Sequence, residues 1–533
     1  MNVKLKSCIS AWKEALGDEF ADKRPETLRR YGANLTPYGA QPVAVLCPGD
    51  QNELRRVLEI ASQHQVPLYP ISRGKNWGYG AAMPSSEECA IVELSRLNRI
   101  IEVNQELAYA VVEPGVTQQQ LYRYLQDHNL PLVMDVTGGP PEASLIGNIV
   151  ERGYGQTQYS DHFLFSSGME VMLANGRTVT TGFGRFENAK TTYLYKWGIG
   201  PVLDGLFTQS NFGIVTKVGV WLMPEPEYFG VFFFQVEDET VLCQVIEKLR
   251  KLRMDGTLTA ATHLANDMRV LSALQQYPWE EAGGRFPLPE EIRKKVISRW
   301  GISRWNCAGG LTGSKPEVLS KVKRIRRELR GLCRVRFISE RMLAWIRRLA
   351  PLFKLLRGVD LNQKLAIFGL MKGIPTEKPT LGCYWRKRCQ APASNLDPVA
   401  DSCGVQWCAP VIPATTRDLT EMLTVTREIT DRCGFELNVS LNLVTPRALS
   451  CIVGIFFDKE DAEQSSAARR CNEELHSRYI ELGYIPYRSG TPYFGTYIKS
   501  STSPTSTFDD VCQEIKKALD PANILAPGRY GIG

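Results

Sequence analysis

The chain has 533 residues, is 43% hydrophobic and carries a formal net charge of +7. A chain of this length buries a sizeable core and predicts two or three domains rather than one. No stretch approaches the roughly 20 uninterrupted apolar residues that span a bilayer, and charges interrupt the N-terminal segment too early for a secretion signal. The composition therefore argues against a membrane-spanning protein and predicts a cytoplasmic location.

The cysteines and histidines are scattered. Fourteen cysteines run from Cys8 to Cys512 without a CxxC pair, and the five histidines are equally dispersed. This pattern predicts reduced, mostly buried thiols rather than a disulfide framework or a zinc site. No metal site is expected.

The positive charge is concentrated in one segment, Lys321 to Gly358, which holds thirteen Lys and Arg against two Glu. Trp345, Leu349, Leu352 and Phe353 give this segment an amphipathic pattern. It could lie on an anionic membrane surface or face an acidic partner, or it could be a solvated basic helix packed on its own domain. Nucleic acid is not an expected partner, because no aromatic-interleaved basic groove or reader motif accompanies the charge.

From Pro42 onwards the pattern alternates between helix and strand, with the apolar residues of 52–65 at helical spacing. Helices are predicted at 52–65 and 117–129, the second capped by Thr117, and strands at 66–72, 89–94, 99–104 and 108–115. Residues 168–182 read as a hairpin whose Asn175-Gly176 suits a type I′ turn. We therefore expect residues 1–226 to form one α+β domain with many strands.

The sequence pattern changes after residue 226, where long basic and Pro-interrupted segments begin. Residues 227–490 are predicted to form a second domain, with a helix starting at Thr416 and a strand at 448–457. The remaining segment, 491–533, contains a helix that Pro521 stops and then an irregular Gly/Pro-rich end.

The stretch "RGKNWGYG", Arg73 to Gly80, is rich in glycine and follows a predicted strand. It matches neither the P-loop nor the G-x-G-x-x-G pattern, and a loop and a strand follow it instead of a helix. Its glycines would still let consecutive backbone N–H groups point at one anion. Similar small-residue loops at 137–148 and 210–224 predict that several loops together clamp the diphosphate of a large cofactor.

Seven blocks of this sequence resemble, in order, the vanillyl-alcohol oxidase and p-cresol methylhydroxylase family of flavoproteins: "PISRGKNWGYGAAMP", "YAVVEPGVT", "ERGYGQTQYSDHF", "SGMEVMLANG", "SNFGIVTKVGVWLMP", "GYIPYRSG" and "DPANILAPGRYGIG". The resemblance implies an α+β fold with an FAD-binding domain at 1–226, a cap domain at 227–490 and a C-terminal segment, 491–533, that completes the FAD domain. Residues from about 226 to 400 add little to it.

The resemblance also implies which residues bind FAD. Arg529 would lie near the flavin ring, where reduced flavin carries negative charge, and Ile214 and Val215 would meet the adenosine side. The pyrophosphate would contact two loops, through Ser72, Gly74, Asn76, Gly78, Ser144, Gly147 and Asn148.

On the substrate side, Tyr79, Tyr487 and Arg488 match the family residues that hold a phenolate. Two hydroxyls and a guanidinium converging on one oxygen form an anion hole of a physically expected kind. The predicted function is an FAD-dependent oxidase or dehydrogenase that removes hydride from a benzylic or related carbon of a small phenolic substrate. The sequence does not determine the electron acceptor. It also leaves open whether this protein forms a homodimer, as members of the family commonly do.

Several positions depart from the family pattern. Thr137 and Gly138 stand where the oxidase has an Asp, Gln156 replaces a pocket Tyr, and Ser450-Cys451 replaces a His pair. These departures motivate a second hypothesis, in which the same fold oxidises a larger or carrier-bound secondary metabolite. A third hypothesis is a non-catalytic scaffold that binds a membrane or partner through residues 321–358.

Covalent attachment of the flavin is not expected. The oxidase's linking His falls at Val405, no Tyr stands where the hydroxylase has its linking residue, and "RGKNWGYG" contains no His. We therefore predict non-covalent FAD.

Overall fold

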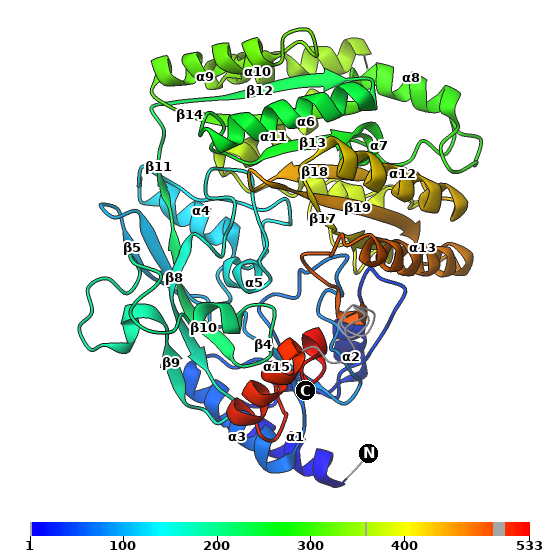
Figure 1. Cartoon of the computed structure of the whole chain (residues 1–533). Helices are drawn as coiled ribbons and strands as arrows, with labels where there is room; N and C mark the ends of the chain where they lie inside the picture. The colour runs from blue at the N-terminus through cyan, green and yellow to red at the C-terminus, as the bar shows by residue number, and fades with distance from the viewer. Residues whose placement is uncertain (1–2, 358–359, 494–506) are drawn as a thin grey trace.

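The computed structural model describes residues 3–357, 360–493 and 507–533. The fold is α+β, as predicted, and contains two smaller sheets and a two-stranded pair from the first part of the chain and one large antiparallel sheet from the second (Figure 1). The termini lie together at one end of the molecule, and α9 and α10 lie at the other.

The first sheet is built around the predicted helix α3 (Gln51–His64). Asp50 caps α3 by accepting from the N–H groups of Asn52 and Glu53, and the buried side of the helix packs on the sheet and on α1 (Val3–Leu16). The strands run in the order β1 (Ala21–Asp22), β2 (Val45–Leu46), β4 (Ala90–Glu93) and β3 (Leu68–Ile71), and α2 (Pro25–Gly32) follows β1. The predicted strands at 66–72 and 89–94 are thereby confirmed.

The second sheet is antiparallel, in the order β5 (Ile100–Asn104), β6 (Tyr109–Val112), β10 (Ile214–Trp221), β8 (Ser166–Met172) and β9 (Thr178–Thr180). α4 (Gln118–Asp127) begins at Thr117, whose hydroxyl accepts from the N–H of Gln120 at 3.0 Å, as predicted. The chain also forms α5 (Leu145–Val150) and the short pair β7 (Leu132–Val133) and β11 (Met223–Pro224).

The β8–β9 hairpin is confirmed, but its predicted turn type is wrong. A type I′ turn needs a positive φ at both central residues. Only Gly176 has one, at 76°, and its N–H donates to the carbonyl of Leu173 at 2.9 Å. The loop is therefore a three-residue turn in which Gly176 supplies the left-handed position.

The large sheet contains all the long strands of the second part of the chain. Its order is β15 (Arg336–Ser339), β12 (Tyr228–Val236), β14 (Trp305–Gly313), β13 (Thr262–Asn266), β18 (Val439–Leu443), β19 (Ala448–Asp458) and β16 (Cys403–Cys408), and β17 (Val411–Pro413) also pairs with β19. Because its first strand begins at Tyr228, we propose that the second domain starts close to residue 227.

The two faces of this sheet differ because side chains alternate along each strand. One face packs against α6 (Glu239–Met254), α9 (Lys315–Glu328), α12 (Thr416–Arg432) and α13 (Ala462–Glu481), and these elements share one large apolar core. The other face lines a cavity, with residues two apart on each strand: Phe233 and Gln235, His263 and Ala265, Asn306 and Ala308, and Ser440 and Asn442. The chain also forms α7 (Asp267–Ser272), α8 (Glu290–Trp300), α10 (Glu340–Arg357) and α11 (Leu361–Gly369).

The C-terminal segment is fastened to the first part of the chain. α15 (Thr507–Leu519) carries Lys516, whose buried amine donates to Asp520 at 2.7 Å and to the carbonyls of Asn211 and Leu525. The side-chain amide of Asn211 donates in turn to the carbonyls of Ala526 and Ile532. Residues 494–506 of the predicted 491–533 segment lie outside the described residues.

The basic segment forms α9, β15 and α10, and its last residue, Gly358, lies outside the described residues. α9 packs its apolar side on its own domain, but α10 leaves Trp345, Leu349 and Leu352 between 54% and 65% exposed. The hypothesis of a basic helix with a packed apolar side is therefore right for α9 and holds only in part for α10, which buries Ala350 and packs Leu343. The membrane or acidic partner stays a prediction.

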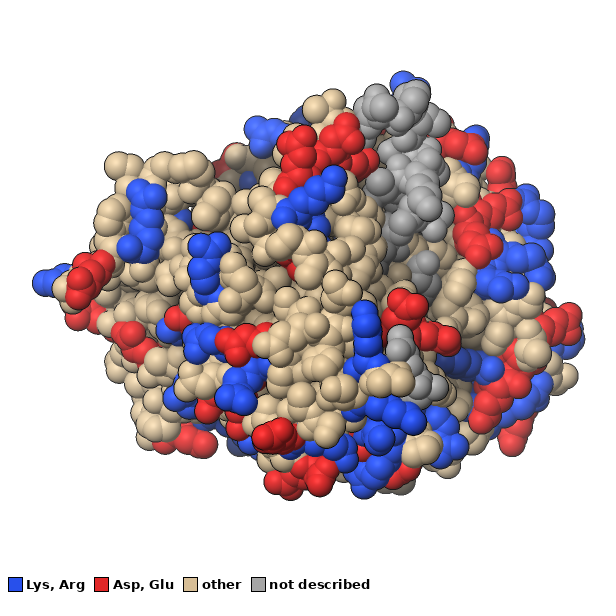
Figure 2. All heavy atoms as spheres, turned by 90° about the horizontal axis from the view of Figure 1, so that it is seen from below, with Lys and Arg blue, Asp and Glu red and all other residues tan. Residues whose placement is uncertain are grey.

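The end of the molecule that carries the termini, opposite α9 and α10, has a surface of mixed charge. Figure 2 shows acidic and basic side chains interspersed over much of this face.

Within the described part of the chain, no helix is long and apolar enough to cross a membrane, and no group of three or more His, Cys, Asp or Glu side chains is placed to hold a metal ion. The fourteen cysteines are free thiols, mostly buried.

Candidate functional site

A cavity of about 750 Å³ is lined by residues from both parts of the chain. One wall consists of the glycine-rich loops and the C-terminal tail, and the other is the open face of the large sheet with parts of α7, α10 and α11. Every candidate site residue from the sequence lines this cavity, with the exception of Gly78.

The loop after β3 uses its glycines for close packing. Gly74 has φ +63°, and a Cβ there would lie 2.9 Å from the Cβ of Ala82. Gly78 has φ +77°, and a Cβ there would lie 2.2 Å from the indole of Trp407. Both positions therefore require glycine, and Gly78 makes room for Trp407 instead of facing the cavity.

The two cofactor loops predicted from the sequence meet at Gly147. A Cβ there would lie 3.4 Å from the hydroxyl of Ser72 and 3.4 Å from that of Ser144. Ser144 caps α5, since its hydroxyl donates to the carbonyl of Pro114 at 2.6 Å and accepts from the N–H of Gly147 at 2.9 Å. The loops are thus close enough for one ligand to touch both.

Asn148 is held by a buried polar network. Its side-chain oxygen lies 2.6 Å from Nδ1 of His162, whose Nε2 lies 2.6 Å from a carboxylate oxygen of Asp135. Asp135 also accepts from the N–H groups of Gln156 and Thr157. This network fixes the direction of the Asn148 side chain where it lines the cavity.

Ile214 and Val215 open β10 and are 3% and 6% exposed. They line the cavity next to the loop that contains Asn211. Ile214 packs into the core around α3, and Val215 packs into the core around α4. These two residues therefore offer an apolar wall at the end of the cavity formed by the first part of the chain.

Glu151 ties the C-terminal tail to the end of α5. Its carboxylate accepts from the guanidinium of Arg529 and from the hydroxyl of Tyr530, the latter at 2.8 Å. The guanidinium of Arg488 lies 3.9 Å from the same carboxylate. Glu151 is the only carboxylate among the cavity-lining residues that the structure describes, so it is the local counter-charge for two arginines.

The residues predicted to hold a phenolate are brought together. The guanidinium of Arg488 lies over the ring of Tyr79, 4.3 Å from its centre, and donates to the side-chain oxygen of Asn76. Tyr487 faces a further tyrosine, Tyr154, at 5.7 Å between ring centres. The hydroxyl of Tyr154 accepts from the amide of Asn442 and from Ser450, each at 3.1 Å.

The protonation of this cluster follows from its burial. Burial raises the pKa of Tyr79 and of Tyr154 well above the ordinary value, so both stay neutral hydroxyls. Burial acts to lower the pKa of Arg488, but its electrostatic interactions with the neighbouring tyrosines, Tyr487 first, outweigh burial and raise the pKa above its ordinary value, so the guanidinium stays charged. Arg488 is therefore a cation beside the neutral hydroxyls of Tyr79 and Tyr154, and its nearest carboxylate is shared with Arg529.

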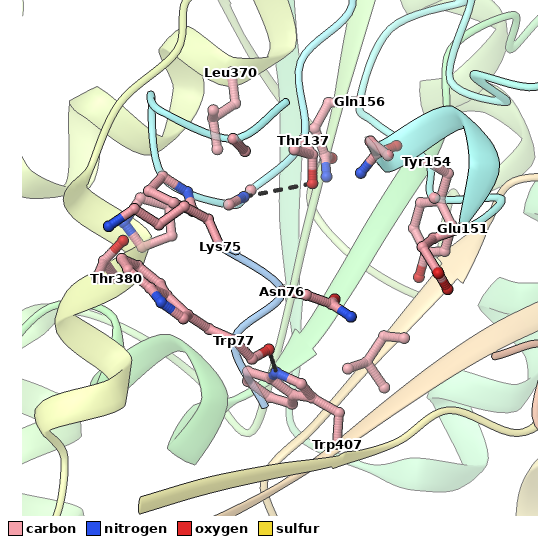
Figure 3. A pocket seen from close by; sticks show the side chains of 18 of the residues that line it. Lys75, Asn76, Trp77, Thr137, Glu151, Tyr154, Gln156, Leu370, Thr380 and Trp407 are labelled. Carbon is pink, nitrogen blue, oxygen red and sulfur yellow. Dashed lines mark hydrogen bonds between the residues drawn. The ribbon is translucent and has the colours of Figure 1, made fainter. Parts of the chain in front are cut away.

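Sequence reasoning missed Trp77, Tyr154, Arg269 and Trp407, all of which line the cavity. Trp407 donates from its indole to the carbonyl of Trp77 at 3.1 Å, which joins the large sheet to the glycine loop (Figure 3). Trp77 and Tyr154 stand inside blocks that carry the family resemblance, so the sequence held a signal for them. Arg269 and Trp407 lie outside those blocks, and no motif marks them.

The departures from the family pattern also fall at this site. Thr137, Gly138 and Gln156 line the cavity without a carboxylate among them. Ser450 lies behind Tyr154 and fixes its hydroxyl. Val405 is fully buried in β16, so it offers no nucleophile to the cavity.

The charge of the cavity suits a dianionic diphosphate. Against the single carboxylate of Glu151, its wall holds several cations: Arg73, Lys75, Arg269, Arg336, Lys364, Arg488 and Arg529. The volume of the cavity lies in the range of cofactor pockets. The loops that meet at Gly147 leave room for a ligand to approach their backbone. The residues present therefore fit FAD.

A family model described as an FAD binding domain matches residues 42–182. The chain is 37% identical to the 1'-carboxy-chondrochloren decarboxylase of Chondromyces crocatus, over 99% of this chain and 97% of that protein. It is 30% identical to the flavoprotein subunit of 4-cresol dehydrogenase (hydroxylating) of Pseudomonas putida, over 98% and 95%. The chain belongs to the vanillyl-alcohol oxidase and p-cresol methylhydroxylase family.

Solved structures of this family have the same fold. The chain superposes on p-cresol methylhydroxylase with substrate bound at a TM-score of 0.88 and 28% identity, covering 100% of this chain and 98% of the other. For 4-ethylphenol oxidase from Gulosibacter chungangensis, in its isoeugenol complex, the TM-score is 0.90 and the identity 27%, with the same coverage. The protein is therefore an FAD-dependent oxidoreductase, an oxidase or dehydrogenase, with the p-cresol methylhydroxylase type of fold.

Proposed function

We propose that this flavoenzyme removes hydride from the benzylic carbon of a para-substituted phenol. The observation that supports the proposal most directly is the cluster of Tyr79, Tyr487 and Arg488 in the same cavity as the glycine-rich loops. When bound, FAD supplies the hydride acceptor. The protein itself binds the phenol, stabilises its anion and excludes water.

In this proposal, Arg488 stabilises the phenolate because its side chain is only 11% exposed and its nearest carboxylate is shared with Arg529. Tyr79 and Tyr487 donate hydrogen bonds to the same oxygen. A phenolate pushes electron density toward its para position, which weakens the benzylic C–H bond toward loss of hydride. The substrate is then left as a quinone methide, which takes up water or loses a second proton.

Anaerobic mixing with 4-ethylphenol and with its methyl ether tests this function. The phenol should bleach the visible absorbance of the bound flavin, whereas the ether should leave it unchanged, because the ether cannot form the anion that Arg488 stabilises. Reduction by both compounds at one rate would show that no phenolate is needed. Failure of every para-alkylphenol, with or without a carboxylate on its alkyl group, would contradict the proposal as a whole.

We also propose that the flavin is bound without a covalent link. Val405, which aligns with the linking His of the family's oxidase, is a buried valine. Precipitation of the purified holoprotein with acid should give a colourless pellet and a yellow supernatant. A yellow pellet would mean that another residue of the cavity wall is the point of attachment.

A second candidate function is oxidative decarboxylation of a larger phenolic metabolite. The observation that favours it is the 37% identity to a protein named as a carboxy-chondrochloren decarboxylase. A quinone methide with a carboxylate on the adjacent carbon can break its C–CO₂ bond, and the bonding pair then forms a C=C bond in the alkyl substituent and restores the phenolate. Analysis of the product for CO₂ and a vinylphenol distinguishes this outcome from hydration.

A further inference from the structure

Arg269 is a partly buried cation of the cavity wall that has no counter-charge among the described residues. It lies on α7, and its guanidinium sits over the ring of Trp407, 4.7 Å from the ring centre. In the described part of the protein, no carboxylate lies within ion-pair distance of that guanidinium, and no hydrogen bond from it is formed. The carboxylate two residues away, Asp267, is occupied by Arg293 at 2.7 Å.

Other buried cations of this protein have polar partners, and Lys196, which has no ion pair, donates to the carbonyls of Phe163 and Ser166. Arg386 lies 3.0 Å from Glu436, and Lys516 lies 2.7 Å from Asp520. An unpaired buried charge costs several kcal/mol of stability in general, so proteins seldom keep one without a ligand. Arg269 therefore differs from the structural arginines of the same protein.

The groups around Arg269 are neutral. Its electrostatic neighbours are Cys383, Tyr154 and Tyr79. Burial raises the pKa of Cys383 to about 12 and those of both tyrosines well above the ordinary value, so none supplies a negative charge near pH 7. The same neighbours place Arg269 at the end of the cavity where Tyr79 and Tyr154 lie.

We propose that Arg269 is the binding site for a carboxylate on the alkyl substituent of the phenolic substrate. This inference rests on the proposed phenol site, because it puts the anion on the same molecule. Arg488 and Arg269 would hold the two ends of the substrate, the first through the phenolate and the second through the carboxylate.

A carboxylate fits this position better than a phosphate does. A guanidinium presents a planar fork that matches the two oxygens of a carboxylate. The nearby wall also contains the apolar residues Val270, Ala273, Leu274 and Phe456 beside His263, whose pKa burial lowers, and a single cation balances a monoanion. Trp407 supports the guanidinium through a cation–π contact, and its own indole is fixed by the hydrogen bond to the carbonyl of Trp77.

Calorimetric binding to the holoenzyme, with its flavin reduced by dithionite beforehand so that the phenolic probes are not oxidised, tests this site with three probes: 3-(4-hydroxyphenyl)propanoate, its amide, and 3-phenylpropanoate. The wild-type protein should bind the hydroxyphenyl acid at least about 30-fold more tightly than the amide, as expected for a buried charged pair. Arg269→Gln should abolish this difference and leave binding of the amide within about threefold. Arg269→Lys, which keeps the charge without the fork, should give an intermediate preference.

The matched control is Arg304→Gln, because Arg304 is half exposed and paired with Glu290 outside the cavity wall. It should keep the wild-type preference. Equal binding of acid and amide to the wild-type protein would overturn the proposal, and that comparison needs no variant to fold. A preference that survives in Arg269→Gln would also overturn it, since another cation such as Lys364 would then hold the carboxylate.

The third probe separates this inference from the proposed function. 3-Phenylpropanoate has the carboxylate but no phenol, so it cannot be oxidised through a phenolate. If it binds to the wild-type protein and loses affinity in Arg269→Gln, the carboxylate site stands even where no phenol reduces the flavin. If phenols reduce the flavin and no probe shows a carboxylate preference, the proposed function stands and the Arg269 site is wrong.

Discussion

Replacing Arg488 with lysine should lower kcat/KM for a reactive para-substituted phenol by about 10²- to 10³-fold. The substitution keeps one positive charge but loses the planar fork that reaches Asn76 and lies over Tyr79. The phenolate is then held less well, so the pH at which flavin reduction reaches half its maximum should move upward. Anaerobic stopped-flow measurements across pH report both effects, with flavin content measured in the same samples.

Two further variants make this result specific. Tyr79→Phe should also slow reduction while the flavin stays bound, because it removes one hydroxyl donor and keeps the ring beneath Arg488. Arg478→Lys is the control, since Arg478 is exposed and paired with Glu481 on α13. Full activity of Arg488→Lys on a phenol that the wild-type enzyme oxidises would remove Arg488 from the proposed mechanism.

The second large effect is expected from Asp520→Asn, which should lower the stability of the folded protein. Asp520 is 1% exposed, neutralises the buried amine of Lys516 and accepts from the N–H groups of Ile524 and Leu525. An asparagine has only one accepting oxygen for these donors and leaves Lys516 as an uncompensated buried charge. The free energy of unfolding should fall by about 3–5 kcal/mol.

Thermal unfolding of the holoprotein, followed by release of the flavin, measures this loss because the C-terminal tail lines the flavin cavity. Replacing both partners with apolar residues, Lys516→Met with Asp520→Leu, should recover much of the stability, since no charge is then left buried. The exposed ion pair of Arg478 and Glu481 offers the control. Glu481→Gln should change the free energy of unfolding by no more than about 0.5 kcal/mol. A wild-type Tm for Asp520→Asn would mean that the tail is not held by this pair.

The elements that the sequence predicted well are those whose signals are local. α3 and α4 carry a capping residue and an apolar stripe at helical spacing, and both formed as predicted. The turn of the β8–β9 hairpin was predicted wrongly because Asn175-Gly176 is compatible with more than one turn, and the spacing of the paired strands selects between them. Whether the apolar side of α10 is packed or exposed stayed open from the sequence, because periodicity indicates which residues share a face but not what covers that face.

The family, its α+β fold and its FAD could be read from the sequence alone, because the glycine loops and the Tyr-Arg pair are short, contiguous motifs. Whether the candidate residues share one cavity depended on the tertiary structure, which brings together residues hundreds of positions apart, such as Tyr79 and Arg488. Only the tertiary structure revealed that Gly78 serves Trp407 and that Arg269 is unpaired in the described cavity wall. A single arginine carries no spacing signal, and its chemistry follows from the charges that surround it after folding.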